Sequence, residues 1–278
     1  MTNNNSKYLW NKIREEIKKT LETEKELVLF YNLNILNHNN FFQSLIHILA
    51  EKLKTDSFNE KNIKNIVNSI SIFHNKLEQQ FSQDLIHIIE NDPVINKKCY
   101  IPFLYFKGFH ALQSYRISHY LWKQKRKSIA LYLQNQISTV FSVDIHPAAK
   151  IGKKVMLDHA TGIVIGETSI IEDNVSIFHS VTLGSKHFIH GNRHPIIRKG
   201  VTIGAGAKII GNIEIGKYSK IGAGSVVLHE VKPYSIVAGI PAKIIGYYKK
   251  NENILVDNNH NIINKKKFFL KFNDGGGI

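Results

Sequence analysis

The sequence has a single cysteine, Cys99, among its 278 residues. No internal disulfide can therefore form, and we expect a reducing compartment, the cytoplasm. No stretch reaches the roughly 18 uninterrupted apolar residues that a transmembrane helix needs. The first residues, MTNNNSKYLWNKIREE, have no apolar core before the acidic pair, so we also expect no secretory signal. These absences predict a protein without a membrane partner.

Acidic residues are scarce relative to basic ones, and the formal net charge is +15. Such an excess raises the possibility of nucleic acid binding. The lysines are scattered along the chain, however, and the one dense run, Lys265 to Lys267, lies near its end. A general preference for Lys, Asn and Ile codons explains this distribution, and an anionic cofactor would use part of the charge. We therefore expect no nucleic acid partner.

The first half of the chain has the apolar spacing of amphipathic helices. Periodic apolar positions predict helices over about residues 6–30, 41–53, from 59, 77–90, 102–121 and 128–139. Asp92-Pro93 ends the fourth of these, because proline cannot continue a helix. Pro102 suits the first turn of the next one. Residues 1–141 are thus predicted to form an α-helical domain, to which the family resemblance described below adds a role in oligomerisation and substrate binding.

From residue 142 the apolar period changes to six. The apolar anchors are Ile145, Ile151, Leu157, Ile163, Ile165, Ile171, Ile177, Leu183, Ile197, Ile203, Ile209, Ile215, Ile221 and Val227. A triangular coil needs one inward apolar residue on each face, and stacked coils bury a continuous column of them. The sequence therefore predicts an α+β protein. Its N-terminal helical domain is followed by a left-handed parallel β-helix of hexapeptide repeats over 142–246 and a flexible C-terminal tail over 247–278.

Two features interrupt the hexapeptide pattern. A two-residue slip occurs at Val164-Ile165, where we expect a local bulge. The polar stretch from Gly184 to His194 breaks the pattern entirely. A polar loop expelled from a regular solenoid commonly lies on the binding face.

Two pairs of residues on the repeats are candidates for chemistry. Asp144 and His159 are fifteen residues apart, and one coil takes about eighteen, so they fall near the same corner of neighbouring coils. A carboxylate beside an imidazole can fix its tautomer and raise its basicity, as a general base requires. Arg193 and His194, at the end of the expelled loop, can clamp a carboxylate. From the residues alone, solvated corner and loop side chains remain an alternative for both pairs.

Three further candidates are ambiguous in the same way. Asp92 is either a turn residue before Pro93 or a substrate contact, and Lys243 is either a phosphate ligand or a surface lysine. His187, His190 and His194 invite a zinc site like that of trimeric β-helix carbonic anhydrases. Their spacing matches no closed zinc site, so we expect no metal. A bound metal ion would restore that alternative.

The motifs together resemble those of bacterial serine acetyltransferases, a family of the hexapeptide-repeat acyltransferase superfamily. The resemblance is carried by DIHPAAKIG from Asp144, by LDHATGIVIGET from Leu157, and by Arg193-His194-Pro195. In the helical half, Asp92-Pro93 and LYFKGFHALQ from Leu104 agree with the family as well. Hexapeptide repeats alone would indicate only the superfamily, whereas the helical half and the LDHATG segment are specific.

The resemblance implies transfer of acetyl from acetyl-CoA to the hydroxyl of L-serine, the first step of cysteine biosynthesis from serine. His159 would be the general base and Asp144 its orienting partner, with direct transfer between the two substrates. Asp92 and Asp158 would contact the ammonium and hydroxyl side of serine. Arg193 and His194 would hold its carboxylate.

The resemblance also implies the remaining ligands and partners. Backbone at Gly184, Ala205 and Ala223 would contact CoA, and Lys243 would lie near a phosphate. A homotrimer or a dimer of trimers is expected, with active sites at subunit boundaries. L-cysteine would act as a feedback inhibitor, and the terminal Ile278 would dock into O-acetylserine sulfhydrylase.

The sequence departs from the family in the loop 184–192, which is usually glycine-rich. Here it carries Lys186, His187, Phe188 and Ile189, which bears on CoA affinity and cysteine inhibition. Two other functions are alternatives. An acetyltransferase for another small hydroxyl or amine, such as a sugar, would have no need of Asp92 or Arg193. A scaffold that only binds the sulfhydrylase would have no need of His159.

Overall fold

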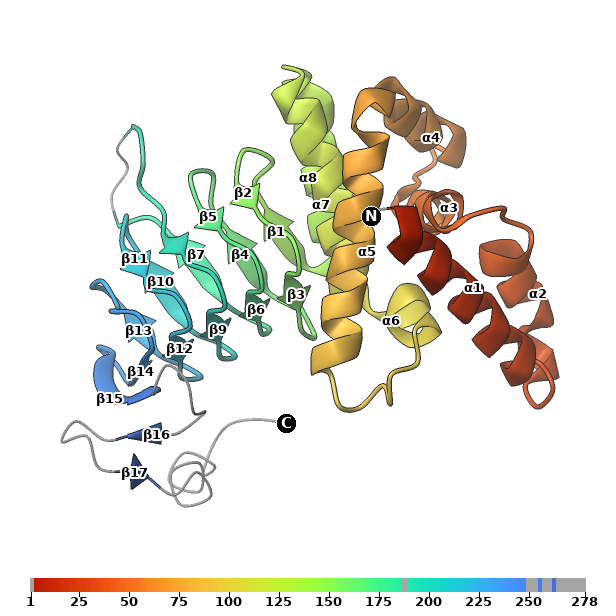
Figure 1. The fold of residues 1–278 in the computed structure, drawn as a ribbon. Helices are drawn as coiled ribbons and strands as arrows, with labels where there is room; N and C mark the ends of the chain where they lie inside the picture. Colours follow the sequence, from red (N-terminus) through yellow and green to blue (C-terminus); the bar gives the residue numbers. More distant parts are fainter. Residues whose placement is uncertain (1–2, 187–189, 249–254, 257–261, 264–278) are drawn as a thin grey trace. The chain divides into compact units, whose positions relative to one another are not determined.

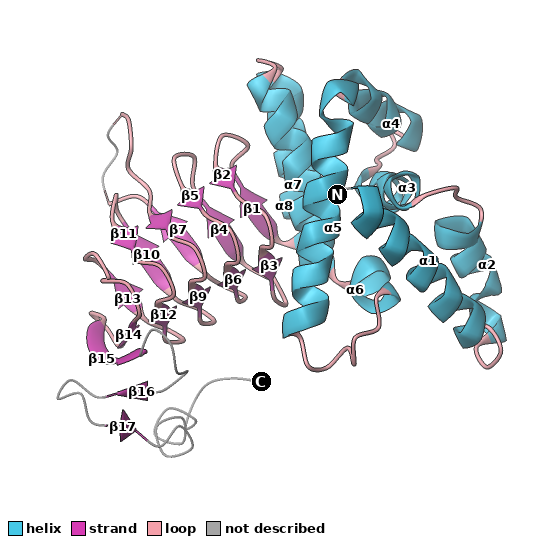
Figure 2. Ribbon diagram, in the orientation of Figure 1, coloured by secondary structure: helices cyan, strands magenta, loops and turns pink. Residues whose placement is uncertain are grey.

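The computed structural model describes residues 3–186, 190–248, 255–256 and 262–263 (Figures 1 and 2). The chain divides into two compact units, residues 1–141 and 142–278. The predicted architecture, helices followed by a parallel β-helix, is confirmed. Among the described residues, no helix is both long enough and apolar enough to span a bilayer.

The first unit is helical. Its helices are α1 (Asn3–Thr20), α2 (Val28–Tyr31), α3 (Phe41–Leu53), α4 (Glu60–Ser69), α5 (His74–Asn91), α6 (Tyr100–Tyr105), α7 (Lys107–Lys123) and α8 (Lys127–Phe141). Short 3-10 turns at Lys25–Leu27 and Ser71–Phe73 and a π turn at Asn32–Leu36 complete it. The side chains of Asn40 and Asn59 cap α3 and α4 by accepting backbone N–H groups. Pro102 lies in the first turn of α6, as predicted.

Two of the predicted helices are interrupted. The helix predicted over residues 6–30 is wrong beyond Thr20, where α1 ends. The hydroxyls of Thr20 and Thr23 donate to the carbonyls of Glu16 and Thr20, at 2.9 and 3.1 Å, and so compete with helical hydrogen bonding. The helix predicted over residues 102–121 is divided at Phe106, whose extended backbone separates α6 from α7.

Helix α7 is buried over most of its surface and carries a buried charge. Arg116 on α7 is 2% exposed, and its partner Asp84 on α5 is fully buried. Nε and Nη2 of Arg116 donate to Oδ2 of Asp84 at 2.9 and 2.8 Å, and Gln113 donates to the same oxygen at 3.2 Å. Because a buried charge is costly unless it is paired, this cluster ties α5 to α7.

His110, also on α7, is a buried imidazole with one hydrogen bond. Its Nε2 lies 2.8 Å from the carbonyl oxygen of Phe103, to which it donates. The ring is 1% exposed, and burial lowers the pKa of His110 to about 4. The neutral imidazole is therefore the form that the helical unit holds.

We expect acid to destabilise the helical unit through His110. The unfolded chain binds a proton at this residue near the ordinary pKa of 6.5, and the folded chain only near 4. The free energy of unfolding therefore falls as the pH falls through this window, by about 3 kcal/mol in all. His110→Gln keeps a donor for Phe103, so it should be less stable at pH 7 yet lose less stability by pH 4.5.

Urea unfolding followed by circular dichroism at the two pH values measures this difference. His74→Gln is the matched control, because the half-buried His74 ring also lies against a backbone carbonyl, that of Val67. An acid-induced loss in His110→Gln as large as in the unaltered protein would contradict the prediction.

The second unit is a parallel solenoid of short strands. The strands that form its coils are β1 (Val143–Ile145), β2 (Lys150–Ile151), β3 (Met156–Leu157), β4 (Ile163–Ile165), β5 (Ile170–Ile171), β6 (Ser176–Ile177), β7 (Thr182–Gly184), β8 (Ile196–Ile197), β9 (Thr202–Ile203), β10 (Lys208–Ile210), β11 (Glu214–Ile215), β12 (Lys220–Ile221), β13 (Val226–Val227) and β14 (Ser235–Ala238). They stack into three sheets, β1-β4-β7-β10-β13, β2-β5-β8-β11 and β3-β6-β9-β12-β14. All fourteen predicted anchors are buried, none more than 9% exposed. The predicted column of apolar side chains is therefore present.

Strand register shows where the two irregularities lie. Ile165 pairs with Leu183, eighteen positions later, which is the regular coil. Ile145 pairs with Ile165, twenty positions later, and the two extra residues lie in the turn before β4 rather than at Val164-Ile165. Leu183 pairs with Ile209, twenty-six positions later, because the expelled loop joins β7 to β8. Both insertions thus flank the sheet that begins with β1.

Part of the predicted tail is paired. Strands β15 (Lys243–Tyr248), β16 (Leu255–Val256) and β17 (Ile262–Ile263) add to the last coil in antiparallel order. The rest of 247–278 lies outside the described residues.

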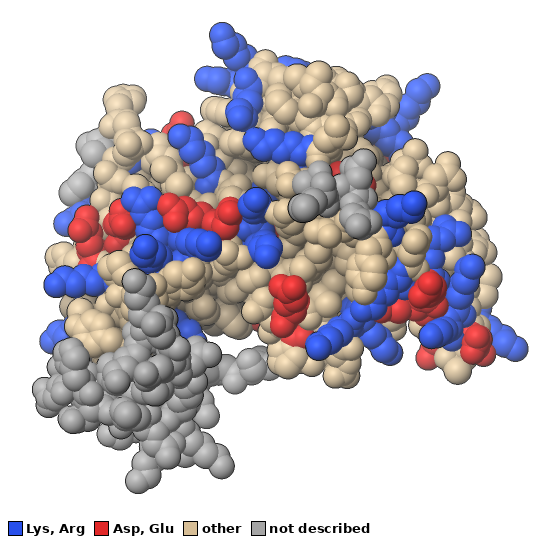
Figure 3. All heavy atoms as spheres, viewed as in Figure 1, with Lys and Arg blue, Asp and Glu red and all other residues tan. Residues whose placement is uncertain are grey.

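Charged side chains bridge successive coils of the solenoid. Arg198 pairs with Glu172 at 2.7 Å and with Glu214 at 2.5 Å. On the face drawn in Figure 3, basic and acidic side chains lie side by side. Part of the positive charge is therefore neutralised locally on this face.

Candidate functional site

The two extra residues enlarge the corner that carries His159. Residues 158–162 join β3 to β4, and His159, Ala160 and Gly162 have φ of 54°, 59° and 74°. Residues other than glycine rarely adopt positive φ, so two in succession mark a strained turn. The Gly162 N–H donates to the carbonyl of Ser142 on the preceding coil at 2.7 Å. This hydrogen bond holds the turn, in which the imidazole of His159 is exposed.

We call the stacked turns 158–162, 178–180, 204–206 and 222–224 the imidazole corner. The ring centroids of His159 and His179 are 5.9 Å apart, with the planes at 82°. Backbone hydrogen bonds of 2.9 and 2.7 Å link the turn of His179 to that of Ala205, and the latter to that of Ala223. The last two turns are Gly-Ala-Gly and carry no side chain larger than a methyl group. The predicted Ala205 and Ala223 thus lie in line with His159.

Asp144 and Asp158 lie close to this corner along the backbone. Asp144 is half-buried in β1 and pairs with Val164 of β4, the strand that His159 leads into. The two predicted residues therefore occupy adjacent coils. Asp158 precedes His159, and its N–H donates to the carbonyl of Ile177 at 2.8 Å, which anchors the turn from the other side.

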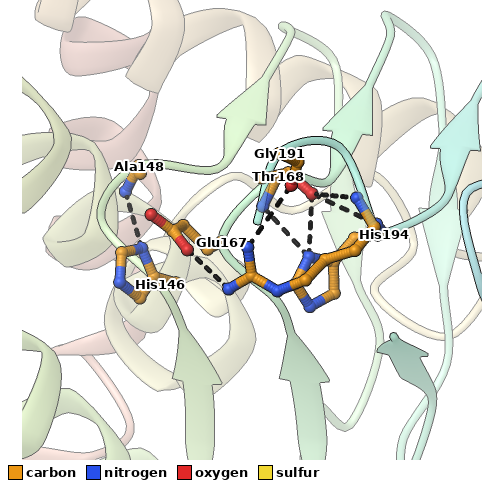
Figure 4. Close-up of polar contacts among 7 residues, drawn as sticks. His146, Ala148, Glu167, Thr168, Gly191 and His194 are labelled. Atoms are coloured by element: carbon orange, nitrogen blue, oxygen red, sulfur yellow. Dashed lines mark hydrogen bonds and ion pairs between the residues drawn. The ribbon is translucent and has the colours of Figure 1, made fainter. Parts of the chain in front are cut away.

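A second corner, at the other end of the same sheet, carries the predicted Arg193 and His194. We call residues 146–149, 166–169 and 193–195 the arginine corner (Figure 4). Nη2 of Arg193 donates to Glu167 at 2.6 Å, and this guanidinium holds the pKa of the Glu167 carboxyl below its usual range. Nη1 makes a longer contact of 3.4 Å with the carbonyl of Gly191. Guanidinium has five N–H donors, so others remain for a ligand.

His194 packs against the preceding coil. It is 7% exposed, and burial, followed by the charge of Arg193, lowers its pKa. Its Nδ1 accepts the N–H of Thr168 at 3.2 Å and lies 2.9 Å from Oγ1 of Thr168 (Figure 4). The ring covers Gly166, where a Cβ would lie 2.0 Å from Nε2. Glycine is therefore required at 166 for this ring position.

A second histidine completes the arginine corner. His146 is half-buried, and its Nδ1 accepts the N–H of Ala148 at 3.1 Å. Burial lowers the pKa of His146, while the carboxylates of Glu167 and Asp144 oppose that shift. One guanidinium and two imidazoles at one corner suit an anionic group such as a carboxylate.

The two corners do not meet within one chain. Gly162 and Gly166 bound β4 on either side, and four residues of extended chain span about 13 Å. His159 and Arg193 lie beyond these two ends, so a ligand of a few atoms cannot reach both in a single chain.

The other predicted residues are dispersed. Asp92 ends α5, and its Oδ1 accepts the N–H of Val94 at 2.8 Å, as a turn residue does. Gly184 ends β7, at the edge of the sheet nearer the arginine corner. Lys243 is exposed at the start of β15. Ile278 and His187 lie outside the described residues, and no cluster of three His, Cys, Asp or Glu suited to a metal occurs in the part of the chain that the structure describes.

Four residues of the two corners were not predicted from the sequence: His179, His146, Glu167 and Thr168. His179 lies twenty residues after His159, so counting a regular coil of eighteen from His159 points to Ile177 and misses His179. Thr168 gave no periodic signal either. Its contact with His194 depends on where the expelled loop returns to the solenoid, which the hexapeptide period does not specify.

Comparisons with known proteins cover both units. Residues 9–114 match the family model for the serine acetyltransferase N-terminal region, and residues 194–229 match that for bacterial transferase hexapeptide repeats. The serine acetyltransferase of Buchnera aphidicola subsp. Schizaphis graminum is 54% identical over 260 residues, 93% of this chain and 97% of its own. A solved serine acetyltransferase in complex with cysteine has a TM-score of 0.84 and 50% identity, covering 86% of this chain and 99% of that chain. Another, in complex with CoA, has a TM-score of 0.81 and 49% identity, covering 88% and 100%.

Proposed function

Because this chain belongs to the serine acetyltransferase family, we propose that it transfers the acetyl group of acetyl-CoA to the hydroxyl of L-serine, giving O-acetyl-L-serine and CoA. The observation that carries the proposal is the identity of 54% over 93% of the chain. This identity extends over the helical unit, which a protein related only through its hexapeptide repeats would not match. Hexapeptide repeats by themselves support acyl transfer and leave the acceptor open. The product would enter cysteine biosynthesis from serine.

The imidazole corner supports the place of acetyl-CoA. Below the two histidines, the corner is reduced to backbone and methyl groups at Ala205 and Ala223. An extended cofactor arm can approach backbone N–H and C=O groups closely only where side chains are this small. CoA bound along these turns would direct its thioester towards His159. Gly184 and Lys243 are proposed as further contacts, the lysine at a phosphate.

His159 is proposed as the general base, oriented by Asp144 from the adjacent coil. His159 takes the proton of the serine hydroxyl as the oxygen attacks the thioester carbonyl carbon. The C–S bond then breaks, and the imidazolium returns the proton to the departing CoA thiolate. The single thiol supports direct transfer, because Cys99 is 1% exposed and burial raises its pKa to about 11.

We propose that the serine site is shared between chains. The imidazole corner and the arginine corner stand at opposite ends of one sheet. In a trimer of parallel solenoids, the arginine corner of one chain would meet the imidazole corner of the next. Arg193 and His194 would then hold the serine carboxylate opposite His159, with Asp158 and Asp92 towards the ammonium and hydroxyl. The helical unit would join two trimers.

The regulatory proposals follow from the relatives. A solved relative binds cysteine, which shares the ammonium and carboxylate of serine and would compete for the same groups. The terminal Ile278 is proposed to dock into O-acetylserine sulfhydrylase. The single buried thiol suits a cytoplasmic enzyme.

An acceptor comparison tests the proposed function. Thiol release from acetyl-CoA is measured with L-serine, with ethanolamine, which lacks the carboxylate, and with a hexose. We expect turnover with L-serine and a loss of about 10²-fold or more with ethanolamine, because a bound guanidinium is then left without its anion. Faster turnover with the sugar would replace the proposal by a sugar acetyltransferase, and no turnover with any acceptor would favour a scaffold.

A further inference from the structure

Thr168 joins the expelled loop to the preceding coil through four hydrogen-bond contacts. Its Oγ1 accepts the backbone N–H of Arg193 at 3.0 Å and that of His194 at 3.1 Å. The same oxygen lies 2.9 Å from Nδ1 of His194, and the Thr168 N–H donates to this nitrogen at 3.2 Å. Figure 4 shows these contacts converging on Thr168 and His194. One residue thus holds both the start of the returning strand and the imidazole.

The directions of these hydrogen bonds fix the protonation of His194. A threonine hydroxyl has one hydrogen and two lone pairs, and the two backbone N–H groups occupy both lone pairs. The hydroxyl hydrogen is then left for Nδ1 of His194, which also receives the Thr168 N–H. A nitrogen that accepts cannot carry a proton. The remaining ring proton of a neutral imidazole must therefore be on Nε2.

The surroundings of Nε2 agree with this assignment. The ring of His194 lies over Gly166, where any side chain would displace it. No residue that the structure describes accepts a hydrogen bond from Nε2, although this ring is 7% exposed. Burial and the charge of Arg193 both disfavour the cationic ring. An N–H donor is therefore held in a fixed direction beside the guanidinium.

We propose that Thr168 is a positioning residue of the serine site, whose hydroxyl keeps His194 as the neutral Nε2–H tautomer so that Nε2–H donates to the substrate carboxylate. This role rests on the proposed function and adds a residue to it. Thr168 itself does not touch the substrate. It acts through the ring orientation of His194 and through the backbone of Arg193.

Substitution of Thr168 by valine tests the role. The change keeps the side-chain shape, removes the donor to Nδ1 and leaves the N–H groups of Arg193 and His194 without their acceptor. We expect the KM for L-serine to rise about tenfold, since orphaned buried donors of this kind commonly cost that factor or more. The KM for acetyl-CoA should change less than about twofold, because the imidazole corner is untouched. Thr168→Ser should restore the serine KM.

The matched control is Thr20→Val. Thr20 is a half-buried threonine at the end of α1 whose hydroxyl donates to the carbonyl of Glu16 at 2.9 Å, and it belongs to neither corner. We expect this variant to keep both KM values. A wild-type serine KM in Thr168→Val, or no rescue by Thr168→Ser, would overturn the proposal.

Nitrogen-15 NMR of the histidine side chains measures the tautomer directly. The His194 signals are identified by their loss in His194→Gln. In the unaltered protein we expect an unprotonated Nδ1 and a protonated Nε2 at pH 7, and a mixture of tautomers in Thr168→Val. A protonated Nδ1 in the unaltered protein would overturn the proposal even if Thr168→Val failed to fold. Absence of acetyl transfer to serine would contradict the proposed function. The spectra would still show, independently of activity, whether Thr168 sets the tautomer of His194.

Discussion

Replacing His159 with alanine is expected to lower kcat for acetyl transfer to L-serine by about 10²-fold or more, because general-base help is typically worth 10²–10⁴. The imidazole is exposed in a turn that hydrogen bonds hold on both sides. Its loss should therefore remove the base without unfolding the coil. The KM values for both substrates should change little, since His159 acts in the proton-transfer step and not in substrate binding. Thiol release with saturating substrates measures the effect.

His229→Ala is the control for this experiment. His229 is an exposed histidine just after β13, outside both corners. We expect its removal to leave kcat unchanged. Equal rates in His159→Ala and the unaltered protein would exclude His159 as the base.

Mixing two inactive variants tests whether the site is shared between chains. His159→Ala chains retain a complete arginine corner, and Arg193→Ala chains retain a complete imidazole corner. In trimers assembled at random from equal amounts, about one site in four would combine the two intact corners. Activity should thus recover to about a quarter of the wild-type value after co-refolding. Mixtures as inactive as their components would show that each site belongs to a single chain.

Replacing Asp84 with alanine is expected to lower the free energy of unfolding of the helical unit by about 3–5 kcal/mol. Arg116 would keep its charge at a position that is 2% exposed, while the Asp84 carboxylate to which it donates at 2.8 and 2.9 Å is removed. The loss of Gln113's acceptor adds to this cost. Urea unfolding at pH 7, followed by far-ultraviolet circular dichroism, measures the change.

Glu51→Ala provides the matched control for the buried pair. Glu51 also makes an ion pair at 2.8 Å, with Lys54, but both side chains are partly exposed to solvent. Its loss should be a small fraction of that in Asp84→Ala. The double change Asp84→Leu with Arg116→Leu should be less destabilising than Asp84→Ala alone, because no unpaired charge remains. A double variant less stable than the single one would contradict this explanation.

The parts of the fold that the sequence predicted depend on neighbouring residues. The fourteen apolar anchors repeat every six positions, and a short window reveals them wherever the period is unbroken. The caps that the structure shows at Asn40 and Asn59 are equally local, since each side chain accepts the backbone N–H of the residue three positions ahead. The prediction was wrong where local competition decides, as at Thr20, whose hydroxyl takes a backbone carbonyl and contributes to the end of α1.

The site needed information that spacing alone does not contain. Asp144 and His159 could be assigned to one corner because one coil separates them. Arg193 and His194 could not be assigned to a corner, because the length of the expelled loop does not show at which position the chain returns to the solenoid. Thr168 pairs with residues twenty-five and twenty-six positions away, and no period in the sequence links them. Arg116 and Asp84 come from separate helices whose packing is likewise not encoded in either period.

The spacing of eighteen residues between the turns of Ala205 and Ala223 has a consequence for the architecture of the molecule. Each further coil of this kind would add one Gly-Ala-Gly turn to the imidazole corner. The row of small turns would then lengthen by about 4.8 Å, the distance between paired strands. Deleting or duplicating one whole coil of eighteen residues would shorten or extend this row of turns. The turns of His159 and His179 would keep their orientation. Under the proposed binding of acetyl-CoA along this corner, the number of whole repeats sets the length available to its extended arm.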